Sequence, residues 1–162
     1  MVDQTYLNAL RIPSMKWNVN SLTYYFVPNG TPNWFSDQDW RPFEKTAFRK
    51  AFDAWSDVAD ISFRQVYNPG ANFNERLKHT LPGNAAGLHT MPEEGGYNAA
   101  GKTAGRYWVL WDAWNKDGLV PSGLGFQSIL HEIGHGLGLA HPFQYDVPVS
   151  VVRVFGTNGC VN

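Results

Sequence analysis

The residues best suited to chemistry in this chain lie between positions 131 and 141, which read HEIGHGLGLAH and fit the pattern H-E-x-x-H-x-x-G-x-x-H. His131 and His135 are four residues apart, so on a helix both imidazoles project from one face. His141 follows a short connection and can turn back toward them as a third ligand. Three neutral imidazoles leave one tetrahedral position of Zn²⁺ open for water, as a catalytic zinc site requires. The spacing therefore predicts a zinc site made by these three histidines.

Two further residues of this stretch have roles in that prediction. Glu132 follows the first histidine directly, where it can take a proton from a zinc-bound water that attacks a carbonyl and pass it to the leaving amine. Gly138 lets the chain leave the helix in a conformation that costs other residues energy. Glu132 could instead act only through its charge, and an isolated His-x-x-x-His is often a packed pair. The five fixed positions together favour zinc-dependent hydrolysis.

Composition indicates a globular protein without a nucleic-acid partner. The chain has 162 residues, of which 43% are hydrophobic and 17% charged, so we expect one domain over residues 1–162 and a monomer. A net charge of −1 without a basic run gives no electrostatic attraction for nucleic acid. Cys160 is the single cysteine, which excludes a disulfide within the chain. Residues 1–10 lack the features of a secretory signal peptide, and no apolar stretch is long enough to cross a membrane.

Hydrophobic periodicity predicts an α/β fold, with one twisted mixed sheet against two helices. A long helix is expected over 36–58, with Ser36 and Asp39 as its capping pair. The apolar face of this helix consists of Trp40, Phe43, Ala47, Ala51, Trp55 and Val58.

The second helix, from about 125 to 137, carries the zinc motif and presents Ile129, Leu130, Ile133 and Leu137 as its apolar side. Its internal glycines, Gly134 and Gly136, indicate close packing against another backbone. The remaining chain is expected to form strands and loops. The strands are expected at 22–27, 61–66, 88–91 and 107–111. An irregular excursion is expected over 68–87, with a short candidate strand near 71–73, and a glycine-rich loop over 93–105.

The strand at 88–91 is the candidate edge for substrate. An extended peptide can bind by adding a strand to a sheet edge beside the metal, and Leu88, His89 and Thr90 are the residues expected there. His89 could also be read as a further ligand, but an ordinary strand residue is the better interpretation. His79, in a polar loop, is expected to be solvated.

The motif with Pro142 after the third histidine resembles the zinc signature of the metzincins, and among them the serralysin-type secreted bacterial metalloproteases. The segments 6–10, 22–26 and 54–63 also resemble the start of that catalytic domain, so the resemblance covers about 6–142. It implies a metzincin-like zincin fold and cleavage of internal peptide bonds in proteins. It further implies ligation of zinc by the three histidines, Glu132 as general base, secretion without an N-terminal signal peptide, and calcium binding.

The sequence departs from that family downstream of the motif. Metzincins have a methionine-containing turn after the third histidine, whereas Met91 is the last methionine here. The only downstream tyrosine, Tyr145, is too near His141 to take the family's metal-approaching role, and the glycine-rich calcium repeats are absent. The tail over 147–162 does not resemble the family. A truncated or diverged zinc-binding domain with little or no turnover is therefore the alternative function.

Overall fold

A five-stranded sheet forms one layer of the protein in the computed structural model, which describes residues 15–31, 35–92 and 102–141. The strand order is β2-β1-β3-β5-β4, and β4 is antiparallel to β5 while the other pairs are parallel. The predicted mixed α/β architecture is confirmed. The strands are β1 (Ser21–Phe26), β2 (Ser62–Gln65), β3 (Phe73–Lys78), β4 (Gly87–His89) and β5 (Thr103–Trp108).

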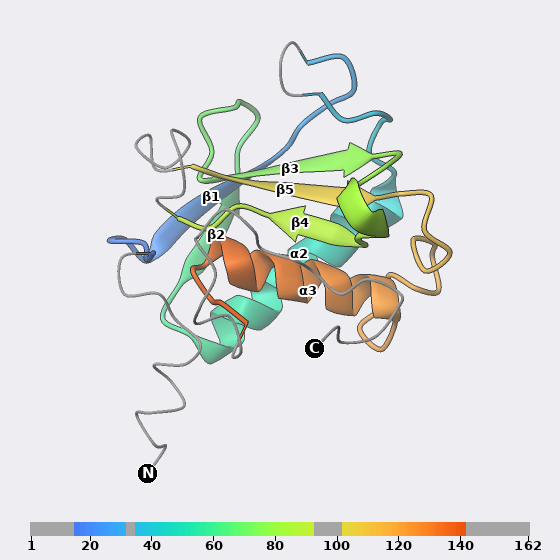
Figure 1. The fold of residues 1–162 in the computed structure, drawn as a ribbon. Helices are drawn as coiled ribbons and strands as arrows, with labels where there is room; N and C mark the ends of the chain where they lie inside the picture. Colours follow the sequence, from blue (N-terminus) through green and yellow to red (C-terminus); the bar gives the residue numbers. More distant parts are fainter. Residues whose placement is uncertain (1–14, 32–34, 93–101, 142–162) are drawn as a thin grey trace.

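Two helices form the second layer, α2 (Pro42–Val58) and α3 (Leu124–Gly136), and both lie on the same side of the sheet (Figure 1). A short 3₁₀ turn, η1 (Pro82–Asn84), leads into β4. Parallel strands need long crossover connections, and α2 serves as the crossover between β1 and β2. In the part of the chain that the structure describes, no helix has the length and apolar composition needed to span a membrane.

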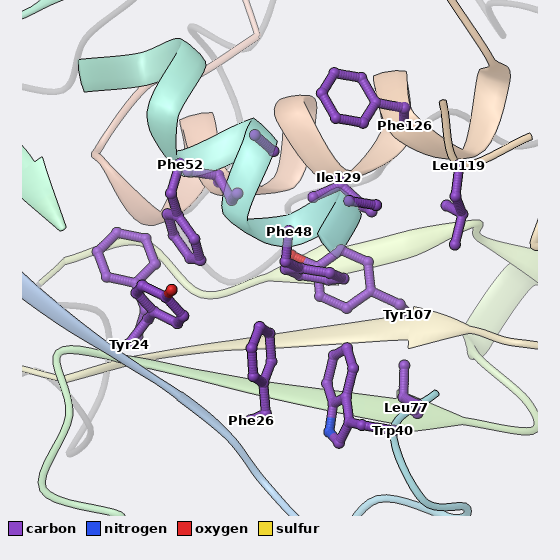
Figure 2. Close-up of a cluster of buried hydrophobic side chains, with 14 of the residues drawn as sticks. Tyr24, Phe26, Trp40, Phe48, Phe52, Leu77, Tyr107, Leu119, Phe126 and Ile129 are labelled. Carbon is purple, nitrogen blue, oxygen red and sulfur yellow. The ribbon is translucent and has the colours of Figure 1, made fainter. Parts of the chain in front are cut away.

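The core between the two layers is largely aromatic (Figure 2). The ring of Phe48 on α2 is central to it, with ring centroids at 4.7 Å from Tyr107, 5.1 Å from Trp40 and 5.7 Å from Phe26. In these three contacts the ring planes are nearly perpendicular, which is an edge-to-face arrangement that aromatic pairs prefer. The core thus ties the middle of α2 to β1 and to β5, and β5 packs against the motif helix α3.

The first helix begins later than the sequence predicts. Ser36 is fully buried, donates from Oγ to the carbonyl of Val27 at 2.5 Å and accepts from the amide of Leu77 at 3.1 Å, so it links two strand ends and does not cap α2. The helix starts at Pro42, and the Glu44 carboxylate accepts from the backbone N–H of Arg41 at 2.6 Å. A buried serine between strands and a capping serine have the same sequence signal.

The predicted apolar face of this helix is only partly correct. Ala47 and Ala51 are buried as expected, but Val58 is 76% exposed at the helix end. Phe48 and Phe52, which the prediction left out, are fully buried because the sheet covers a wider part of α2 than a single stripe.

The strand predictions were wrong for two of the central strands. β3 lies within the segment expected to be irregular, and β5 begins at Thr103, within the expected glycine-rich loop, and ends at Trp108 rather than at residue 111. Strand β3 has the sequence FNERLK, which is mostly polar. Its alternate residues Phe73, Glu75 and Leu77 are nevertheless all buried. The tail over 147–162, Tyr145, Cys160 and residues 1–10 lie outside the described residues.

Candidate metal centre

The three histidines of the motif come together in space. One ring nitrogen from each of His131, His135 and His141 lies within 4.8 Å of the others. The Nε2 atom of His131 lies 3.0 Å from the Nε2 atoms of His135 and His141. Tetrahedral Zn²⁺ with Zn–N bonds of about 2.0–2.1 Å needs ligand nitrogens about 3.3 Å apart. The donor set, its convergence and its spacing therefore fit a zinc ion.

The end of α3 explains how the third histidine returns to the first two. The amide of Gly138 donates to the His135 carbonyl and the amide of Leu139 donates to the Gly134 carbonyl, both at 2.9 Å, which is the Schellman pattern of a helix C-terminus. That pattern needs a left-handed residue directly after the cap, and Gly138 has φ of +100°. A Cβ atom at Gly138 would also lie 1.9 Å from the carbonyl oxygen of Met15. The expected role of Gly138 in leaving the helix is confirmed.

Burial keeps the imidazoles in the neutral form that binds a metal. Burial lowers the pKa of His131 to about 4 and that of His135 to about 3. Burial also lowers the pKa of His141. Nδ1 of His135 donates to the Leu139 carbonyl at 2.7 Å, which directs the lone pair of Nε2 toward the other two rings.

Glu132 is held beside this cluster without a hydrogen-bonding partner among the described residues. The residue is fully buried, and both of its carboxylate oxygens are unpaired there. Burial raises the pKa of the Glu132 carboxyl well above its usual range, the nearby charge of Glu75 adds to the shift, and Arg106 opposes it. The side chain of Glu132 fits here because residue 87 of β4 is a glycine. A Cβ atom at Gly87 would lie 2.7 Å from Cγ of Glu132.

Aromatic rings pack against the glycines of α3, whereas the sequence led us to expect a backbone. A Cβ atom at Gly134 would lie 3.1 Å from Cζ2 of Trp55, and one at Gly136 would lie 2.4 Å from Cε1 of Phe73. The indole N–H of Trp55 donates to the Leu130 carbonyl at 3.1 Å. The motif helix is thus fixed by rings from α2 on one side and from the sheet on the other.

Two of the three predicted substrate residues, Leu88 and His89, lie on β4, which forms one edge of the sheet, and Thr90 follows that strand directly. The amide of Thr90 donates to the Ala104 carbonyl of β5, so by the alternation of an antiparallel ladder the main-chain groups of His89 face the outer side. The side chain of His89 is buried against α3, whereas Leu88 and Thr90 are half-buried. His79 is exposed, as expected.

Glu75 is a fully buried carboxylate close to the motif helix that was not among the predicted site residues. Its Oε1 atom lies 3.2 Å from Nε2 of His89, and its Oε2 atom has no hydrogen-bonding partner among the described residues. The signal that could have found it is the alternation of Phe73, Glu75 and Leu77, which places the carboxylate on the helix-facing side of a strand.

No protein-family model matches the chain. Among curated proteins, it is 25% identical over 133 residues to Metalloprotease AprA of Pseudomonas entomophila, covering 78% of this chain and 27% of that protein. It is 24% identical over 155 residues to Serralysin B of Dickeya chrysanthemi, covering 89% of this chain and 32% of that protein. It is 31% identical over 145 residues to Karilysin of Tannerella forsythia, covering 83% and 28%.

The chain spans roughly a quarter to a third of the length of these relatives. The matched part includes most of this chain, and the three histidines form the cluster expected of a zincin helix. In sequence and in the arrangement of these histidines, the chain is thus similar to a metzincin-type metalloprotease catalytic domain, with serralysins among its relatives.

Proposed function

We propose that this chain is a zinc-dependent metalloendopeptidase domain that hydrolyses internal peptide bonds of proteins. The observation that carries the proposal is the convergence of His131, His135 and His141 beside the buried carboxylate of Glu132. The three imidazoles would hold the metal. Zinc bound there would acidify a water molecule and polarise the scissile carbonyl.

Glu132 is the proposed general base. Its carboxylate accepts a proton from the attacking water and delivers that proton to the nitrogen of the departing amine, so the residue is regenerated in each cycle. Two observations support this assignment. Both carboxylate oxygens are free of partners among the described residues, and burial raises the pKa of the carboxyl, which makes it a better proton acceptor.

The edge strand β4 is the proposed substrate-binding element. An extended peptide would pair with the outer main-chain groups of the segment Leu88, His89 and Thr90, with side-chain contacts from the half-buried Leu88 and Thr90. Recognition would then rest on the peptide main chain, which suits cleavage of proteins in extended segments. We also propose that the domain acts outside the cell, as its resemblance to secreted bacterial metalloproteases implies.

The test is hydrolysis of a casein-like protein by the zinc-loaded chain. We expect cleavage that a chelator blocks, and a loss of kcat by about 10²-fold or more in Glu132→Gln with zinc still bound. Glu44→Gln is the matched control, because Glu44 is also fully buried but lies at the start of α2, and this variant should keep its activity. Zinc binding without cleavage would favour the alternative of a diverged zinc-binding domain. Cleavage that persists in Glu132→Gln would overturn the assignment of the base.

A further inference from the structure

A buried acid–histidine pair lies between the sheet and the motif helix, and the proposed reaction does not use it. Glu75 of β3 is 0% exposed and His89 of β4 is 3% exposed, and Oε1 of the first lies 3.2 Å from Nε2 of the second. Gly105 of β5 is in register with both residues. A Cβ atom at Gly105 would lie 1.9 Å from Oε2 of Glu75, so the glycine leaves the space that lets the pair form across the intervening strand.

The imidazole of His89 is held on both sides. Its Nδ1 atom lies 2.9 Å from the carbonyl oxygen of Thr90. A carbonyl can only accept, so Nδ1 must carry a hydrogen. The contact between Nε2 and the Glu75 carboxylate requires one further proton, on either partner. The ring therefore has one orientation in which both nitrogens are satisfied, and Glu75 is the group that fixes it.

In that orientation the ring packs directly against the end of α3. A Cβ atom at Gly136 would lie 2.6 Å from Cε1 and 2.9 Å from Nδ1 of His89. Gly136 follows the proposed zinc ligand His135 and precedes the turn that returns His141. The ring of Phe73 extends the same surface, with its centroid 5.4 Å from that of His89.

We propose that Glu75 and His89 act as one positioning unit, which sets the end of α3 and hence the placement of His135 relative to His141. This inference rests on the proposed zinc site. The observation that carries the inference is that the His89 imidazole, held at both nitrogens, packs against the backbone of Gly136, which lies between the proposed ligands His135 and His141. Partners that orient metal ligands without touching the metal change metal affinity by about 10–100-fold when they are removed.

The experiment measures the metal affinity of the full chain by competition with a chelator, together with the absorption spectrum of the Co²⁺-loaded protein, which reports ligand geometry. Glu75→Leu and His89→Phe should each weaken zinc binding by about tenfold or more and alter the cobalt spectrum. Glu75→Gln should keep affinity within about threefold, because its amide can donate to Nε2 of a neutral His89. Retention by this conservative variant separates the hydrogen bond from the charge.

The matched control is Glu44→Leu, which removes another fully buried carboxylate far along the chain from the motif. It should lower the free energy of unfolding and leave the zinc affinity and cobalt spectrum unchanged. If Glu75→Leu and His89→Phe bind both metals as the wild type does, or if Glu44→Leu weakens binding equally, the positioning role is wrong.

Two outcomes keep this inference separate from the proposed function. If the wild type binds zinc without cleaving protein, the proposed function fails while metal affinity still tests the pair. If the wild type binds neither metal, both fail. If neither Glu75→Leu nor His89→Phe folds, the metal affinity of His89→Gln tests the inference, because this variant keeps a polar side chain but loses the ring that packs against Gly136. We expect binding at least about threefold weaker with a changed cobalt spectrum, and wild-type values would overturn the inference.

Discussion

The indole N–H of Trp17 donates to the carbonyl oxygen of Gly136 at 2.8 Å, which joins residues 119 positions apart. The carbonyl lies in the last turn of α3, where helix carbonyls lack an intrahelical donor. The indole ring also stacks on Phe73, with centroids 5.7 Å apart. The end of the motif helix is therefore held by a segment that precedes β1 as well as by the sheet.

The left-handed conformation of Gly138 gives the first prediction. Gly138→Ala should lower the free energy of unfolding by about 2 kcal/mol or more and weaken zinc binding, because a Cβ atom adds backbone strain and meets the Met15 carbonyl. Gly83→Ala is the control, since Gly83 has φ of +66° but open space around its Cβ position. The free energy of unfolding of Gly83→Ala, measured with denaturant, should fall by about 1 kcal/mol, and its zinc affinity should be that of the wild type. Equal zinc affinity in both variants would contradict the role of the turn.

Zinc stoichiometry tests the three ligands. The wild type should bind one zinc ion per chain, and His135→Ala should bind none at the same free zinc concentration, because two imidazoles do not make the site. His79→Ala removes an exposed histidine outside the cluster and should keep the full stoichiometry. Metal analysis after gel filtration measures both. Retention of tightly bound zinc by His135→Ala would show that the ion lies elsewhere.

Stability of the metal-free protein should depend on pH through the buried imidazoles. Their pKa values in the folded state are lowered, to about 4 for His131 and about 3 for His135, so the unfolded chain binds more protons. The stabilisation is present above the unfolded pKa of about 6.5 and is lost as pH falls toward the folded values. Urea unfolding from about pH 8 to about pH 5 should show this decline in Glu132→Gln, which removes the opposing contribution of the raised Glu132 pKa. Adding His131→Gln and His135→Gln to that variant should make the decline shallower, and an unchanged slope would exclude these groups as its cause.

The aromatic core should be most sensitive at Phe48. Phe48→Ala removes a fully buried ring that contacts four other rings and should cost about 3–5 kcal/mol of unfolding free energy. Val58→Ala is the control on the same helix, and because Val58 is 76% exposed the change should stay within about 0.5 kcal/mol. Thermal unfolding of both proteins measures the difference. Similar losses would contradict the burial pattern of α2.

The motif helix was predictable because each of its features is local. The spacing of His131 and His135 follows the helical repeat, and Gly138 meets a conformational requirement within one turn. The partners of Glu75 and Ser36 were not predictable, because they come from distant parts of the chain and depend on strand register. In β3 the apolar residues Phe73 and Leu77 alternate, but the charged Glu75 stands between them, so the signal for a buried central strand is weak.

Burial of the imidazoles also determines the proton balance of metal uptake. With pKa values of about 4 and 3, His131 and His135 carry no excess proton near neutrality. Loading a cation there would displace almost no protons from these nitrogens, unlike a centre whose ligands must first be deprotonated. Any dependence of the heat of loading on the ionisation enthalpy of the buffer would then come from Glu132 or from an acidified water, and mild acidity would compete only weakly with the metal for these nitrogens.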